Sequence, residues 1–191
     1  DSYLPRYRSY RDFLAWLDRR DMATAVGSWQ HALDGLDSAT LLVDEPAVES
    51  AGDQIPIELG LDLGHRTAEG LADLSRDRGI TMNTLVQAAW GLVLARTLGS
   101  DDVVFGATVS GRPPEIPGVE SILGLFINTI PVRIRLDERE TVLGLLERIQ
   151  SEQAGLLDAH HVGLPTIQRS AGLPILFDTL TVFESYPVDR G

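Results

Sequence analysis

Two adjacent histidines, His160 and His161, are the residues of this chain that most resemble a catalytic pair. They follow a stretch with helical periodicity, where the helix dipole favours a protonated imidazole, so we interpret them as structural. A metal site would need further ligands at a suitable spacing, and only the scattered His31 and His65 remain. We therefore expect neither catalysis nor metal binding from the histidines.

Other side chains with catalytic potential also lack a supporting pattern. Ser110 precedes Gly111, but the sequence has no Gly-x-Ser-x-Gly motif, so a Ser-His-Asp triad has no support beyond spacing. The P-loop and dinucleotide-binding fingerprints are absent, and the Asp101-Asp102 pair is typical of a solvated turn before a strand. Cysteine and lysine are missing altogether, which excludes thiol and Schiff-base chemistry. We expect no catalytic residue in this chain.

Composition narrows the possible functions further. The 28 acidic and 16 basic side chains give a formal net charge of -12, which repels phosphate backbones, so we expect no nucleic-acid partner. No stretch approaches the roughly 20 apolar residues of a membrane-spanning helix, so we expect no membrane partner. The lack of cysteine favours a cytoplasmic protein, and the exclusive use of arginine indicates a GC-rich, actinobacterial source.

Apolar periodicity predicts helices over residues 7–33, 67–79, 81–99 and 141–159. The first region is expected to hold one or two helices with a break near Gly27, and the third is expected to be largely buried, with Thr81 or Asn83 as its cap.

Strands are predicted over residues 55–63, 102–109, 124–136 and 176–184, the first at a sheet edge because it contains Pro56. A stiff loop with three prolines spans residues 111–118, and a polar, flexible loop is expected at 34–54. The pattern predicts an α/β fold, a mixed sheet with helices packed on it, as a single lobe over residues 1–191.

Five motifs, in order, resemble those of the condensation domains of nonribosomal peptide synthetases. Residues 10–16 are similar to the family's Tyr-x-Asp-Phe-Ala-Val-Trp helix. Residues 83–90 look like its buried central helix, and they are followed by Val-Phe-Gly at 104–106 and Ser-Gly-Arg-Pro at 110–113. The most specific match is Gly-Leu-Phe-Ile-Asn-Thr at the start of 124–133, where the family has Gly-x-Phe-Val-Asn-Thr.

The resemblance implies a fold like chloramphenicol acetyltransferase, in which two lobes form a V around a tunnel. Family members carry His-His-x-x-x-Asp-Gly in the N-terminal lobe, so this chain would be the C-terminal lobe, incomplete at both ends and without the catalytic motif. The pair His160-His161 does not replace that motif, because Pro165 and Thr166 stand where Asp and Gly are needed. It matches instead the family's His-Gln-x-x-Pro-Phe-Glu region, from which the chain departs at Val162, Thr166 and Ile167.

The implied reaction joins a carrier-bound aminoacyl or peptidyl thioester to a carrier-bound acceptor amine through an amide bond. The implied partners are the N-terminal lobe, upstream and downstream peptidyl carrier proteins and an adjacent adenylation domain. The carriers deliver 4'-phosphopantetheine arms, and the lobe itself is expected to bind no cofactor. Such synthetases make antibiotics and other secondary metabolites. Asn128-Thr129 and the segment 182–187 look like peptide-bond-forming members rather than epimerization domains.

The resemblance also suggests roles for individual residues. We expect Asn128, Thr129 and Arg112 to line the tunnel, where Asn128 either contacts substrate or satisfies buried backbone groups. Arg112 would meet a phosphate of the arm or pair with a carboxylate. Tyr10, Asp12 and Trp16 belong to the structural motif, and we expect Asp12 and Trp16 to be packing residues.

Two other functions stay open at this point. The chain could belong to a related thioester-dependent acyltransferase that esterifies an alcohol, or to a noncatalytic condensation-like module that docks a partner protein.

Overall fold

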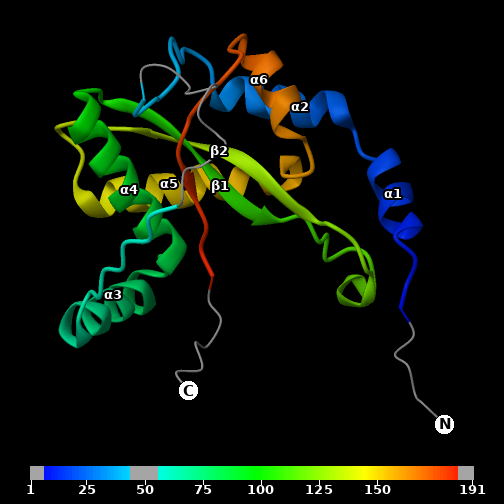
Figure 1. Cartoon of the computed structure of the whole chain (residues 1–191), viewed down its shortest axis with the longest axis horizontal. Helices are drawn as coiled ribbons and strands as arrows, with labels where there is room; N and C mark the ends of the chain where they lie inside the picture. The colour runs from blue at the N-terminus through cyan, green and yellow to red at the C-terminus, as the bar shows by residue number, and fades with distance from the viewer. Residues whose placement is uncertain (1–6, 44–55, 185–191) are drawn as a thin grey trace.

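A mixed three-stranded sheet forms the centre of the computed structural model, which describes residues 7–43 and 56–184. Strand β1 (Asp102–Ser110) lies between β2 (Ile127–Arg135), which is antiparallel to it, and the short β3 (Leu180–Thr181), which is parallel. Figure 1 shows the sheet with helices packed around it. The predicted α/β class with a mixed sheet is confirmed.

Six α-helices and two short 3₁₀ helices are found within the described residues: α1 (Arg11–Asp18), α2 (Met22–Ala32), α3 (His65–Arg78), α4 (Met82–Leu98), η1 (Val119–Ser121), α5 (Val142–Gly155), η2 (Leu157–Ala159) and α6 (Leu164–Ala171). Helix α2 packs on α6, and α4 packs on α5 (Figure 1).

Alternation along β2 separates the two faces of the sheet. Ile130, Val132 and Ile134 are almost completely buried, and the side chain of Ile134 lies so close to Gly91 of α4 that a Cβ there would overlap it. Arg133 points to the opposite face, where its guanidinium reaches the end of α2. The sheet therefore has α4 on one face and the end of α2 on the other.

The main hydrophobic core includes β1, β2 and the inner sides of α2, α4 and α5. Trp29 of α2 is 1% exposed, and its indole Nε1 donates to the carbonyl oxygen of Ala159 at 2.9 Å. This hydrogen bond fixes the segment that follows α5 against α2.

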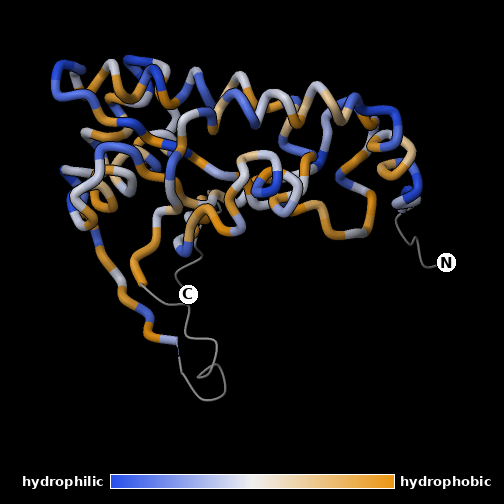
Figure 2. Tube along the Cα trace, turned by 90° about the horizontal axis from the view of Figure 1, so that it is seen from above, coloured by the Kyte–Doolittle hydropathy of each residue, from blue (hydrophilic) through white to orange (hydrophobic). Residues whose placement is uncertain are grey.

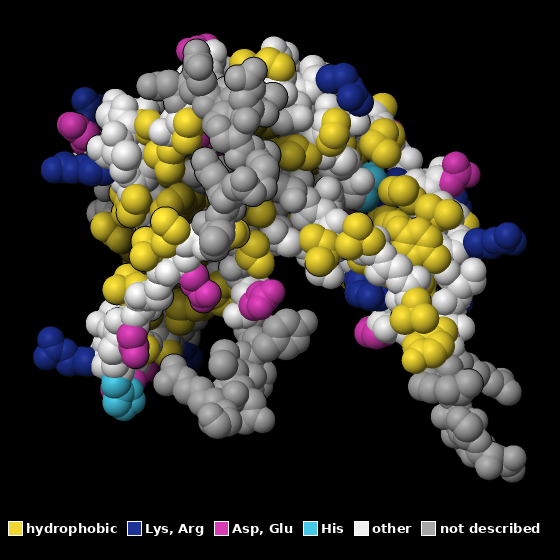
Figure 3. All heavy atoms as spheres, in the orientation of Figure 1, with side chains coloured by type: hydrophobic (Ala, Val, Ile, Leu, Met, Phe, Trp, Pro, Cys, Tyr) yellow, Lys and Arg dark blue, Asp and Glu magenta, His cyan; other side chains and the backbone are white. Residues whose placement is uncertain are grey.

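A second, smaller core lies apart from the first. Ile116, Val119, Ile122 and Phe126 are buried there, and Tyr10, Phe13 and Trp16 pack against them. We call α1 and the loop 111–126 together the arm. Figure 1 shows the arm projecting from one end of the sheet, and Figure 3 shows apolar side chains gathered on it, with a hollow between the arm and the part that carries α3.

The strand predicted over residues 55–63 is wrong for the described part, 56–63, which pairs with no strand there. Its alternating apolar residues are exposed, Leu59 at 90%, and Figure 2 shows the alternation along the tube next to a grey trace. Ile55 lies outside the described residues. Among the residues that the structure describes, no strand lies beside this segment to complete a ladder.

Four other elements differ from the prediction in their bounds. The first helical region breaks before Asp21, not near Gly27, because the Asp21 carboxylate accepts from the backbone N–H of Thr24 and starts α2. Helix α5 ends at Gly155 instead of residue 159, and α3 begins at His65 rather than after Thr67. The last strand is reduced to β3. Thr81 is the cap of α4, one of the two predicted.

The described part of the predicted flexible loop, residues 34–43, is tied to the sheet. Thr40 is 5% exposed, and its hydroxyl accepts from the backbone N–H of Val104 at 2.7 Å. The backbone N–H groups of Leu42 and Val43 donate to the carboxylate of Asp178. Residues 44–54 lie outside the described residues, so flexibility there stays a prediction.

Candidate functional site

A pocket with a volume of about 590 Å³ lies between the arm and the main body. We call it the arm pocket. Four segments that are far apart in the sequence line it: α1 with Arg20, residues 110–115, residues 125–128, and residues 157–161. Its size and its aromatic lining with a few polar groups are typical of small-molecule sites.

Arg112 holds the loop wall of the arm pocket in shape. Its Nη1 donates to the carbonyl oxygens of Val119 and Ile122 at 2.6 and 3.1 Å, and its guanidinium stacks over the ring of Phe126 at 4.2 Å. Its described partners are therefore backbone carbonyls and a ring. The phosphate or carboxylate contact expected for Arg112 stays a prediction.

Asn128 lies at the start of β2 and binds the segment 160–162, which forms the opposite wall of the arm pocket. Its Nδ2 donates to the carbonyl oxygens of His160 and Val162 at 2.7 and 2.9 Å, and its Oδ1 accepts from the backbone N–H of Thr129 at 2.9 Å. Asn128 lines the arm pocket, whereas Thr129 lies one residue beyond the lining. The amide is thus engaged with the backbone while one side of the residue faces the pocket.

The motif residues of α1 contribute to the arm in different ways. Tyr10 packs on Phe13 and Phe126, and its hydroxyl donates to the carbonyl oxygen of Leu125 at 3.1 Å. Trp16 lines the pocket and packs against the second core, whereas Asp12 forms a surface ion pair with Arg8 at 3.0 Å. These contacts place Tyr10 and Trp16 in the arm core and Asp12 at its surface.

Arg20, His160 and His161 also line the arm pocket, although none of them was predicted to belong to a site. Arg20 pairs with Glu115 at 2.8 Å across the pocket, and its guanidinium lies 4.1 Å from the ring centroid of Trp16. The ring of His161 meets Trp16 edge-on with centroids 5.9 Å apart. The only sequence signal was that the histidine pair falls in a motif of the resembled family.

The expectation of a protonated histidine pair at a helix C-terminus is wrong. Helix α5 ends at Gly155, and η2 carries the chain inward before His160. Burial lowers the pKa of His160, and burial together with the nearby Arg20 charge lowers the pKa of His161. Both imidazoles are therefore neutral near pH 7, and a neutral imidazole offers one N–H donor and one lone pair.

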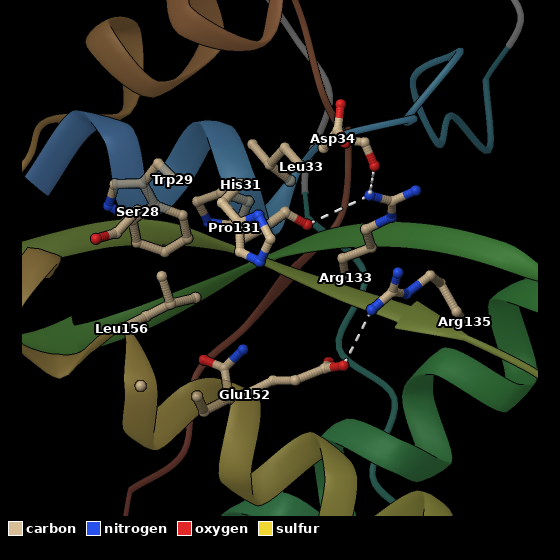
Figure 4. Close-up of a pocket in the computed structure, with 13 residues that line it drawn as sticks. Ser28, Trp29, His31, Leu33, Asp34, Pro131, Arg133, Arg135, Glu152 and Leu156 are labelled. Carbon is tan, nitrogen blue, oxygen red and sulfur yellow. Dashed lines mark hydrogen bonds and ion pairs between the residues drawn. The ribbon is translucent and has the colours of Figure 1, made fainter.

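A second cavity of about 430 Å³ lies between α2, β2 and α5 (Figure 4). Arg133 closes one side of it: its Nε and Nη2 donate to the Asp102 carboxylate at 2.9 and 2.6 Å, and its Nη1 donates to Asp34 O at 2.7 Å. Asp102 is thus an ion-pair partner rather than only a solvated turn residue. The hydrogen bonds between Arg133 and the Asp102 carboxylate raise the pKa of Arg133. These groups are committed to holding the fold together.

Within the described ranges, no group of three or more potential ligand side chains could hold a metal ion. No helix in the same part of the chain is long and apolar enough to cross a membrane.

Comparisons with known proteins agree with the motifs that meet at the arm pocket. The family model "Condensation domain" matches residues 2–190. One subunit of the linear gramicidin synthase of Brevibacillus parabrevis is 41% identical over 192 residues, which cover 98% of this chain and 4% of that protein. Surfactin synthase subunit 3 of Bacillus subtilis (strain 168) is 35% identical over 185 residues, which cover 97% of this chain and 14% of that protein.

Solved structures show the same fold. The first condensation domain of the CDA synthetase superposes with a TM-score of 0.67 at 19% identity, covering 92% of this chain and 38% of that one. The chain thus spans a small part of the curated relatives and less than half of the solved domain. The predicted chloramphenicol acetyltransferase-like fold is confirmed, and the chain belongs to the condensation domain family of nonribosomal peptide synthetases.

Proposed function

We propose that this chain forms one wall of the reaction chamber in which a nonribosomal peptide synthetase joins two carrier-bound substrates by an amide bond. The supporting observation is that the motifs at residues 10–16, 110–113 and 124–128 converge on the arm pocket, together with residues 157–161. Segments so distant in sequence meet there, and none of them contains the family's His-His-x-x-x-Asp-Gly motif. Such convergence fits a surface that positions substrate.

In the proposed reaction the lone pair of the acceptor amine attacks the carbonyl carbon of the donor thioester. The C–N bond forms, the C–S bond breaks, and the departing sulfur leaves as a thiol after the amine has given up a proton. The sequence contains no His-His-x-x-x-Asp-Gly motif, so the group that orients the amine or accepts its proton would come from the partner lobe. This chain would contribute pocket shape through Asn128 and Arg112, with Thr129 next to the lining.

The proposal includes the partners and the setting of the parent protein. Upstream and downstream carrier proteins would deliver the substrates on 4'-phosphopantetheine arms, and an adenylation domain would lie nearby, as expected for a multidomain synthetase. The parent would act in the cytoplasm of a GC-rich bacterium and make a secondary metabolite.

The test is dipeptide formation by the intact parent protein with both carriers loaded, comparing Asn128→Ala with the unmodified protein. Removing the amide frees the carbonyls of His160 and Val162, so the pocket wall should loosen and the single-turnover rate should fall about tenfold or more, the factor that follows from about 1.4 kcal/mol. The matched control is Asn83→Ala, because Asn83 is the other asparagine of the chain and lies on α4, outside the pocket.

The same assay separates the other two functions. Faster product formation with an alcohol acceptor than with an amine would identify an ester-forming acyltransferase. A docking module would be identified if the parent forms no product with either acceptor but still binds a partner protein. An Asn128→Ala rate equal to that of Asn83→Ala would show that the arm pocket has no part in the reaction.

A further inference from the structure

Buried polar atoms without a partner concentrate at the arm pocket. Among the residues that the structure describes, five buried side-chain nitrogen or oxygen atoms make no hydrogen bond. Three of them are Arg20 Nε, His160 Nε2 and His161 Nε2, and all three residues line the arm pocket. The other two, on Trp90 and Thr179, line neither this pocket nor the cavity between α2 and α5. Buried polar atoms without a partner are rare in native proteins, so a group of three at one pocket calls for an explanation.

The histidine wall is held in a fixed position. Asn128 donates to the carbonyl oxygens on either side of His161, those of His160 and Val162, and therefore pins the backbone that carries both rings. The ring of His161 is also confined edge-on against Trp16. Rings fixed in this way can recognise a ligand with little loss of conformational freedom.

Arg20 is fixed as well. Its Nη2 is bound to Glu115, and its guanidinium stacks on Trp16, which leaves the Nε–H as its uncommitted buried donor. The backbone N–H of Glu115 and the Arg20 guanidinium lower the pKa of Glu115, so the ion pair persists at neutral pH. The arm pocket thus combines a fixed N–H donor with imidazoles that have a lone pair to offer.

These groups favour one kind of chemical partner. A carboxylate would accept from Arg20 but has no hydrogen for an imidazole lone pair, and an ammonium group has no lone pair with which to accept from Arg20. A neutral secondary amide fits both requirements, because its carbonyl accepts from Arg20 and its N–H donates to a ring nitrogen.

We propose that Arg20, His160 and His161 are the recognition residues of the arm pocket and bind a secondary amide of the ligand. The inference rests on the proposed function, which brings two sources of such amides to the site: the pantetheine arm and the backbone of the growing peptide. His161 is the specificity residue on which the proposal is most easily tested, because glutamine also donates and accepts hydrogen bonds and therefore provides a conservative replacement.

The test is NMR of the full chain with ¹⁵N-labelled histidine, titrated separately with pantetheine and with N-acetylalanine N-methylamide. The chain has four histidines, so His31, in the other cavity, and His65, at the start of α3, serve as internal controls. We expect the ring signals of His160 and His161 to shift while those of His31 and His65 stay in place. A shift with only one probe identifies the source of the amide.

Two variants make the test quantitative. His161→Leu should weaken binding of the effective probe about three- to tenfold, the loss expected for one hydrogen bond, whereas His161→Gln should stay within about threefold. If His161→Leu does not fold, as a thermal melt would show, the titration of the unmodified chain still decides.

The outcomes also separate this inference from the proposed function. Pantetheine that binds by saturation-transfer NMR without moving His160 or His161 would overturn the recognition residues and leave the proposed function standing. If neither probe binds at all, the arm pocket does not take a carrier-bound substrate, and both proposals fail.

Discussion

Replacing Arg133 by methionine removes the guanidinium that joins β1, β2 and the end of α2. The side chain is 8% exposed and makes two hydrogen bonds to Asp102 and two to the carbonyl oxygens of Ala32 and Asp34. Removing one partner of a buried ion pair costs about 3–5 kcal/mol. Because the Asp102 side chain is 35% exposed and can regain water, we expect the lower end, about 3 kcal/mol.

The assay is equilibrium urea unfolding of the chain. With a slope of about 2–3 kcal/mol per molar urea, the Arg133→Met midpoint should fall by about 1–1.5 M. The matched control is Arg135→Met, on the same strand and face, since Arg135 is 54% exposed and makes one ion pair with Glu152 at 3.1 Å. Its loss should stay within about 1 kcal/mol. Equal losses for the two variants would refute the idea that the buried, multiply bonded arginine holds these elements together.

Three further results are expected. Burial holds the pKa values of His160 and His161 below their ordinary 6.5, so below that pH the unfolded chain binds protons that the folded chain does not. The free energy of unfolding should therefore fall between about pH 7 and about pH 5, and it should fall less steeply when both His160 and His161 are replaced by glutamine. The same slope in both proteins would contradict the lowered pKa values of the two histidines. Gly111→Ala should destabilise the chain by about 1–3 kcal/mol, because the new Cβ would overlap the carbonyl oxygen of Phe126. Gly27→Ala, inside α2, should instead stabilise the chain by about 0.5–1 kcal/mol. Urea unfolding that shifts in the same direction for both variants would contradict this expectation. Thr81→Ala should lose about 1 kcal/mol with the cap of α4, measured by thermal melting against Thr97→Ala near the other end of that helix.

The parts of the fold that were predicted from sequence are those with a strong local pattern. The apolar run of α4 favours a helix and the β-branched runs of β1 and β2 favour strands through local sequence alone, so the positions of these elements agree closely with the prediction. The segment 56–63 has an equally clear alternation, but a strand also needs a neighbour, and alternation carries no information about the neighbour. The break before α2 was misplaced because the Asp21 cap decides where the helix starts, while Gly27 is tolerated inside it.

The candidate site was predictable only in part. Asn128 and Arg112 reach the arm pocket because they belong to motifs beside strands, where the ends of β1 and β2 place them. The histidines were misread because burial lowers the pKa of both, and burial depends on packing between segments far apart in the chain, such as the contact of His161 with Trp16. Arg20 carried no motif, so its position became apparent only once α1 was packed on the loop 111–126.

The separate core of the arm has a consequence for how the molecule opens. Its four buried residues bury far less apolar surface than the main core, so the arm should form its own cooperative unit with a smaller free energy of local unfolding. Amide hydrogens of α1 should then exchange sooner than those of β1. The arm pocket lies on the border between these two units, so local unfolding of the arm would expose the pocket while the sheet stays folded.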